Sequence, residues 1–369
     1  MSVVCSADWE WWLRLILVPG ISLATQRRLL ALAGPPDVAL RLPERTLAPL
    51  IGEAHARTLL AGPDRRLMGR SVAWLSQAGH SLLTLSDAAY PKALLEIADP
   101  PLALFASGNL GLMARRGIAV VGSRNATRQG LEDAFSFSAS LSRSGLCIVS
   151  GLALGVDGAA HRGGLAGAGG SIAVLGNGPD RIYPAAHEAL ARQLENVGLL
   201  LSEHAPGAAP RAHHFPRRNR LISGLSEGVL VIEAAERSGS LVTARQALEQ
   251  GRDVFALPGS IHSPLARGCH ALIKQGAALV EAPADVLSEL GVTARPSPVP
   301  TEPSQNNDDE LGFLDAAPTS VDTLVARSGH STQAVLAKLA QLEIAGSIER
   351  LAGGLYRRLK RQPQPRGIE

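Results

Sequence analysis

Residues 118–128 read IAVVGSRNATR, where an apolar run is followed at once by a glycine turn that carries an arginine. The run has the length and the composition of a buried strand, and Gly122 ends it. The helix that follows such a turn presents unpaired backbone amides at its first residues. Together with the hydroxyl of Ser123 and the guanidinium of Arg124, these amides predict a site for an anion, and an exposed phosphate suits it best.

The same pattern of apolar run, glycine-containing turn and amphipathic segment repeats from Gly117 to about Leu290. Runs that are apolar on both faces and alternate with helices indicate an α/β fold, in which a parallel sheet is covered by helices on both sides. In such sheets ligands bind beyond the carboxyl ends of the strands. The predicted strands are Ile118 to Val121, Leu146 to Ser150, Ser171 to Leu175, Leu199 to Ser202, Val229 to Glu233, Asp253 to Leu257 and Ala278 to Glu281.

The chain has 369 residues, which is enough for two or three domains. We expect a helical N-terminal domain over residues 1–89 and the α/β core over 90–291, with a connector over 90–116. In the N-terminal domain, residues 17–34 have either a helix-hairpin-helix pattern or that of a small packing module. The proline-rich stretch 292–310 is predicted to be a linker.

Residues 311–361 have the pattern of a winged helix-turn-helix, with two amphipathic segments and a short strand pair around Gly353. The expected recognition helix carries Lys338 as its one cation. The pattern therefore leaves open whether this domain contacts protein or duplex DNA.

Composition limits the classes of partner and compartment. The chain has 36 Lys and Arg against 33 Asp and Glu, a formal net charge of +3, so nucleic acid would be bound by local placement of cations. Its three cysteines are far apart and form no CxxC pair, which favours a reducing compartment. No uninterrupted apolar run reaches the length of a membrane span. We expect a soluble cytoplasmic protein without a metal or a cofactor.

Several nucleotide-binding and catalytic motifs are absent. The turn after Gly122 lacks the second and third glycines of a dinucleotide fingerprint, and no lysine follows a glycine as a P-loop requires. GLSEG at 224–228 precedes a strand, whereas a nucleophile elbow follows one. Asp157 and His161 share a helical face and could act as an acid/base pair. The alternative is that Asp157 caps the helix and His161 lines the cleft.

Residues 209–228 contain four arginines within ten residues, with an aromatic ring among them. Guanidinium groups bind the phosphates along a nucleic-acid backbone, and an aromatic ring stacks on a base. A loop of this composition therefore suits single-stranded nucleic acid. A second small-residue turn, Ser238 to Ser240, opens a helix after the fifth strand and can face an anion in the same crevice. The sequence thus predicts an open groove that binds a polynucleotide. Asn219 is available there for hydrogen bonding. The groove contains the ring of Phe215 and the cations Arg124, Arg211, Arg217, Arg218 and Arg220.

The order and spacing of these segments resemble the bacterial DNA-processing protein A family, DprA or Smf. The motifs that carry the resemblance lie between Gly117 and about Ala282: GSRNAT, SGLALGVDGAAH, AVLGNGPDRIYP, FPRRNRLISGLSEGVLVIEA, SGSLVTA and ALPGSIHSPLARGCHALIKQGA. The flanking regions resemble the SAM-like and winged-helix domains of the longer members.

The resemblance implies an extended Rossmann-like fold that binds single-stranded DNA without catalysis, forms homodimers and helps to load the RecA recombinase in natural transformation. It implies three groups of phosphate or base contacts, with Arg211 in place of a basic residue that the family often has at the position of Ala212. These groups comprise Gly122, Ser123 and Arg124, then Arg211, Phe215, Arg217, Asn219 and Arg220, and finally Ser238, Gly239 and Ser240. Two alternatives are a phosphoribohydrolase-like enzyme using Asp157, Glu233 or Glu236, and a duplex-binding regulator with the core as its sensor.

Overall fold

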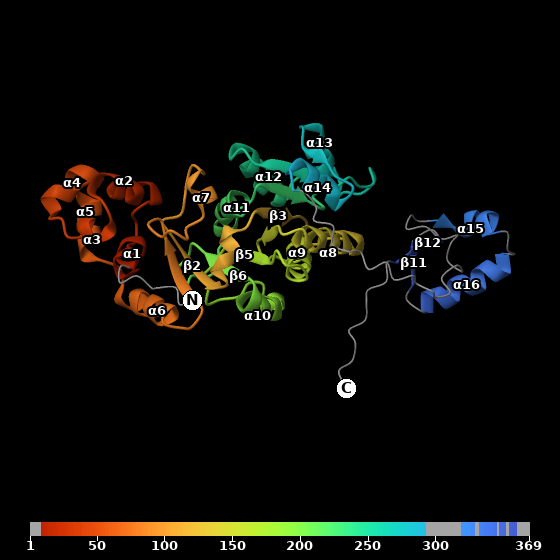
Figure 1. The fold of residues 1–369 in the computed structure, drawn as a ribbon, viewed down its shortest axis with the longest axis horizontal. Coiled ribbons are helices and arrows are strands. Elements are labelled where there is room, and N and C mark those ends of the chain that lie inside the picture. Colours follow the sequence, from red (N-terminus) through yellow and green to blue (C-terminus); the bar gives the residue numbers. More distant parts are fainter. Residues whose placement is uncertain (1–8, 293–318, 329–331, 345–346, 352–353, 360–369) are drawn as a thin grey trace. The chain divides into compact units, whose positions relative to one another are not determined.

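The computed structural model describes residues 9–292, 319–328, 332–344, 347–351 and 354–359 (Figure 1). The chain forms two compact units, Met1–Arg295 and Pro296–Glu369. Within the described residues, no helix is long and apolar enough to cross a membrane.

A nine-stranded sheet forms the centre of the first unit, in the order β1-β2-β6-β5-β4-β3-β7-β8-β9. All seven predicted strands are present, and each is parallel to its neighbours among these seven. The predicted α/β fold with a mostly parallel sheet is therefore confirmed. These seven strands are β3 (Gly117–Val121), β4 (Cys147–Ser150), β5 (Ser171–Leu175), β6 (Leu199–Ser202), β7 (Gly228–Val231), β8 (Asp253–Ala256) and β9 (Ala278–Leu279).

Two further strands extend the sheet where we expected a helical domain and a connector. β1 (His80–Thr84) pairs antiparallel with β2 (Ala103–Gly108), and β2 pairs antiparallel with β6. The sheet therefore begins before residue 90, and the stretch expected to be a connector contains β2. Its apolar run is buried on both sides of the strand, which is a stronger signal than the prolines that precede it.

Helices cover both faces of the sheet (Figure 1). On β3, Ile118 and Val120 pack with α8, α9 and α14, while Ala119 and Val121 pack with α7, α11, α12 and α13. Successive residues thus enter opposite cores, as expected for a strand buried on both faces. The helices are α7 (Lys92–Leu95), α8 (Arg128–Arg143), α9 (Val156–Leu165), α10 (Glu188–Val197), α11 (His214–Gly224), α12 (Ser240–Glu249), α13 (Arg267–Lys274) and α14 (Pro283–Glu289), with short 3-10 turns at Leu110–Ala114 and Ala185–His187.

In the described stretch from Trp9, six helices precede β1 and enclose a core of their own, built around Trp12, Leu13 and Leu47. That core continues onto β2 through Phe105, and Arg27 forms an ion pair of 2.6 Å with Asp99. The N-terminal helices are therefore packed against the sheet. They are α1 (Trp9–Ile16), α2 (Leu23–Ala33), α3 (Pro36–Ala39), α4 (Glu44–Ile51), α5 (Glu53–Ala61) and α6 (Arg65–Leu75).

The described residues of the second unit form a three-stranded sheet in the order β10-β12-β11 with two helices, which is the predicted winged helix. Its core comprises Leu324, Val335, Leu339, Ile348 and Tyr356. The predicted linker lies outside the described residues except for Val292. The elements are β10 (Thr319–Ser320), α15 (Val321–Ser328), α16 (Thr332–Ile344), β11 (Ile348–Leu351) and β12 (Leu355–Arg358).

Candidate nucleic-acid interface

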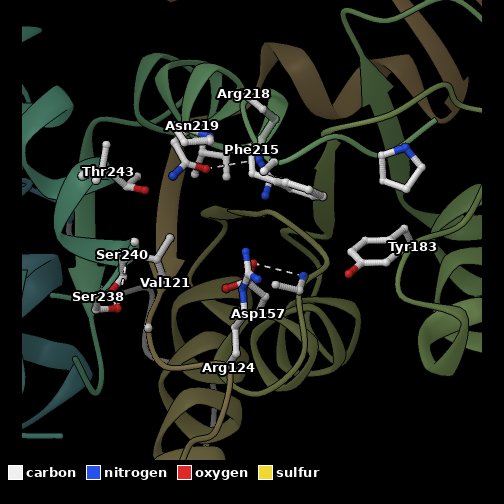
Figure 2. A pocket seen from close by; sticks show the side chains of 18 residues that line it. Val121, Arg124, Asp157, Tyr183, Phe215, Arg218, Asn219, Ser238, Ser240 and Thr243 are labelled. Carbon is white, nitrogen blue, oxygen red and sulfur yellow. Dashed lines mark hydrogen bonds between the residues drawn. The ribbon is translucent and has the colours of Figure 1, made fainter. Parts of the chain in front are cut away.

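The strand order places a crevice at the carboxyl ends of β3 and β7. After β3 the chain adds β4, β5 and β6 on one side of the sheet, and then returns to add β7, β8 and β9 on the other. Loops leave these two neighbouring strands in opposite directions, which opens a crevice where ligands bind in such folds. A cleft of about 680 Å³ lies there, lined by residues 121–124, 210–222 and 238–243 in part, and by Ala153, Asp157 and Tyr183 (Figure 2).

The turn after β3 is held by hydrogen bonds from both sides. The carboxylate of Glu233, just beyond β7, accepts the backbone N–H of Thr127 at 2.9 Å and its hydroxyl at 2.7 Å. The carbonyl of Ser123 accepts the amide of Val156 at 3.1 Å. Thr127 also caps α8, since its Oγ1 accepts the amide of Gly130. Arg124 thus projects from a fixed turn, and its side chain is exposed.

The aromatic side of the cleft belongs to α11. Phe215 is half-buried, and its ring centroid is 5.7 Å from that of Tyr183 and 5.7 Å from the guanidinium carbon of Arg124. A Cβ at Gly176 would be 2.8 Å from the Phe215 ring, so the glycine allows this close approach. The pairing of a cation with an aromatic ring is favourable in itself and offers a guanidinium and a π-face to one ligand.

The segment around Phe215 is a helix and not the loop that the sequence predicted. α11 begins at His214, so Phe215 and Pro216 lie in its first turn. Proline is tolerated there because the first amides of a helix have no acceptor within the helix. The consequence is that the arginines of this segment point to different sides of one helix.

Arg218 is the cation of α11 that reaches the cleft, although it is 5% exposed. Its Nη1 donates to the carbonyl of Gly151 at 2.7 Å and to that of Val174, and its Nε donates to Asn219 Oδ1 at 3.2 Å. Burial lowers the pKa of Arg218 to about 10, against the opposing charge of Asp157. The sequence places Arg218 among the cations of the predicted groove, but the family resemblance does not include it among the eleven contact residues.

A third side of the cleft is the first turn of α12. Ser238 Oγ lies 2.7 Å from Ser240 Oγ and accepts the amide of Ser240 at 3.3 Å. Gly239 is exposed, and a Cβ added there would meet no atom within 4 Å. Together with Val242 and Thr243 these residues bring a helix N-terminus to the cleft, where Ser238 and Ser240 lie near Val121 (Figure 2). Such an end attracts anions.

Seven of the eleven predicted site residues line this cleft, so the structure brings together all three segments that the sequence singled out. The seven are Gly122, Arg124, Phe215, Asn219, Ser238, Gly239 and Ser240. Ser123 is buried beneath the turn, where its Oγ accepts the amide of Asn125 at 3.1 Å. Arg211 and Arg217 are exposed but do not line the cleft.

Arg220 does not share the cleft with Arg124, so that expectation is wrong. The Arg220 guanidinium forms ion pairs with Glu203 at 2.6 Å and with Asp99 at 3.3 Å, and the residue is 7% exposed. The physical reason is the period of α11, because two residues along a helix turn the side chain by about 200°. Arg218 and Arg220 therefore point to different sides. Arg220 links α11 to Glu203, which follows β6, and to Asp99, which precedes β2.

The residues considered for catalysis have structural partners. Asp157 accepts the amides of Gly151 and Ala153 at 3.1 and 3.2 Å, and burial raises its pKa despite the neighbouring Arg218. His161 is fully buried, so it does not line the cleft. Its Nδ1 is 2.8 Å from Ser171 Oγ and its Nε2 accepts the amide of Leu152, and burial lowers its pKa to about 3.

Comparison with known proteins identifies relatives over most of the chain. The family described as DNA recombination-mediator protein A matches residues 81–291, and the DprA winged helix domain matches residues 292–354. Protein Smf of Escherichia coli is 44% identical over 318 residues, which cover 83% of this chain and 84% of the relative. The DNA processing protein DprA of Streptococcus pneumoniae is 49% identical over 207 residues, covering 56% of this chain and 73% of the relative.

Two solved structures share the fold. The X-ray structure of DprA from Streptococcus pneumoniae matches with a TM-score of 0.68 and 38% identity, covering 76% of this chain and 97% of that one. The second structure, described as showing the single-stranded DNA binding mode of DprA from Helicobacter pylori, matches with a TM-score of 0.52 and 30% identity. It covers 57% of this chain and 95% of that one. The chain therefore belongs to the DNA recombination-mediator protein A family.

Proposed function

We propose that this chain binds single-stranded DNA in the cleft at the carboxyl ends of β3 and β7. The observation that carries the proposal is the convergence of Arg124, Phe215 and the first turn of α12 on one open cleft. Guanidinium and helix amides suit phosphates, and an accessible ring suits an unstacked base. A relative of known structure is described as a single-stranded DNA-binding protein, which supports the same reading.

The proposed contacts follow the geometry. Arg124 and the backbone amides around Gly122 and Gly239 bind successive phosphates. The Phe215 ring stacks on a base. Arg211 and Arg217 are exposed on the same segment as Phe215 and attract the strand as it leaves the cleft. The protein acts without a chemical step, protects single strands during natural transformation, and helps to load the RecA recombinase as a homodimer in the cytoplasm.

A fluorescence titration of labelled oligo(dT) and of a duplex of the same length, at several salt concentrations, tests the proposal. We expect tighter binding of oligo(dT), with an affinity that falls as salt rises. Equal affinity for the duplex, or no dependence on salt, would contradict the proposal. Turnover of a nucleoside monophosphate would favour the alternative, an enzyme that uses Asp157 in the same cleft.

A further inference from the structure

Arg218 lines the cleft but is buried. Its hydrogen bonds go to protein oxygens, whereas an arginine that binds a ligand keeps its donors free for that ligand. Nη1 and Nε of its guanidinium donate to three protein oxygens: the carbonyls of Gly151 and Val174, and Asn219 Oδ1. A buried guanidinium needs such acceptors, because an unpaired N–H away from water is costly. The acceptors come from the turn after β4, from β5 and from α11 itself, so one side chain joins three elements.

The turn after β4 is shaped to receive this guanidinium. A Cβ at Gly151 would be 2.5 Å from Arg218 Nη1, so only glycine leaves room for it. The carboxylate of Asp157 holds the same turn by accepting the amides of Gly151 and Ala153. The turn is therefore fixed between a cation on one side and an anion on the other, and the two charges compensate each other.

The bond from Arg218 Nε also orients Asn219. An arginine nitrogen can only donate, so the amide atom that faces it is the oxygen of Asn219. The Nδ2 end of this amide is then directed away from Arg218, and Asn219 lines the cleft (Figure 2). Asn219 thus offers a hydrogen-bond donor, which suits a phosphate or a base carbonyl.

We infer that Arg218 is a positioning residue of the cleft, which holds the Gly151 turn against α11 and directs the amide nitrogen of Asn219 to the DNA. Arg218 itself neutralises no phosphate. The inference rests on the proposed function, because its effect is seen in the binding of a single strand.

The test compares three variants of the full chain by titration with oligo(dT). Arg218→Lys keeps the charge but loses the planar fork, and Gly151→Ala keeps Arg218 but removes its space. We expect each to weaken binding at least about tenfold, as for loss of hydrogen bonds to a charged group. Arg218→Gln weakens binding too, with the same salt slope as the unchanged protein. Matched controls are Arg192→Lys, on the exposed side of α10, and Gly69→Ala, where a Cβ meets no atom within 4 Å.

Three outcomes would overturn the inference. Near-normal binding by Arg218→Lys would mean that charge alone is used, and near-normal binding by Gly151→Ala would mean that the position of the guanidinium is unimportant. A salt slope flattened by about 0.7 in Arg218→Gln would reveal a phosphate contact. If instead Arg124→Ala leaves binding unchanged, the proposed function fails and not this inference alone.

A measurement on the unchanged protein remains decisive if a variant does not fold. When oligo(dT) is added, the side-chain amide resonances of Asn219 should shift strongly in an NMR spectrum, and the Nε–H resonance of Arg218 should shift little. A strong shift at Arg218 with none at Asn219 would contradict the inference. In the folded variants, Asn219→Ala should cost less affinity when combined with Arg218→Lys than on its own, because the two residues act as a unit.

Discussion

Phe215 gives the clearest prediction for a single residue. Its ring lies beside Arg124 and Tyr183 in the cleft, so Phe215→Ala removes the stacking surface and leaves the cations in place. We expect a loss of about 1 to 3 kcal/mol of binding free energy for oligo(dT), with little change in salt slope. Phe135→Ala is the matched control, because Phe135 is an exposed aromatic residue on α8. An equal loss in both variants would contradict the assignment.

His161 predicts how stability depends on pH. Burial lowers its folded-state pKa to about 3 from an ordinary value of 6.5. Between these two pKa values, His161 is protonated in the unfolded chain and neutral in the folded chain. The free energy of unfolding therefore falls as the pH drops below 6.5. Between pH 7 and pH 5 this residue should cost on the order of 2 kcal/mol of unfolding free energy. His161→Gln should be less stable at pH 7 but lose less on acidification in urea titrations; an unchanged pH dependence would contradict the account.

Residue roles could be predicted from the sequence where a turn fixes the direction of the side chain. Arg124 follows a strand and a glycine, and it lies in the cleft as expected. Arg218 and Arg220 could not be told apart, because the choice depends on the phase of α11, and the segment was interpreted as a loop. Which of the two arginines points to the cleft depends on acceptors from distant parts of the chain. These acceptors are Gly151 for Arg218 and Glu203 for Arg220.

At the scale of elements, the turn between β3 and α8 depends on the contact of Thr127 with Glu233. Thr127→Val loses both the cap of α8 and the hydroxyl bond to the carboxylate. We expect a loss of about 1 to 2 kcal/mol in unfolding free energy and weaker binding of oligo(dT), because Arg124 is then held less firmly. Thr127→Ser is the control that keeps both bonds. If Thr127→Ser and Thr127→Val behave alike in urea unfolding and in titration, the anchoring role is refuted.

The strands of the parallel part of the sheet were predictable because apolar runs alternate with glycine turns and helix-length segments. β3 to β9 lie in the parallel part of the sheet, where an apolar run bounded by glycine turns identifies each strand. β1 and β2 were missed, since the first two residues of β1 are partly exposed and β2 follows a proline-rich stretch. The pairing of β3 with β7, which creates the cleft, joins residues more than a hundred positions apart and leaves no local signal in the sequence.

At the scale of the whole molecule, the described residues that line the cleft lie between Val121 and Thr243 in the first compact unit. A chain that ends at Arg295 should therefore keep its affinity for oligo(dT) and the main thermal unfolding transition. Calorimetry and titration of the shortened protein beside the full chain check this expectation. A large loss of affinity on removal of residues 296–369 would show that the winged helix takes part in binding.

The central claim is that a single strand lies in the cleft with a phosphate on Arg124. The most direct test is the logarithmic salt dependence of oligo(dT) binding for the unchanged protein and for Arg124→Ala, with Arg192→Ala as a control on an exposed helix surface. The account predicts weaker binding by Arg124→Ala and a slope flattened by about 0.7, the value for one phosphate contact on a single strand. An Arg124→Ala protein with the slope and affinity of the control would contradict it.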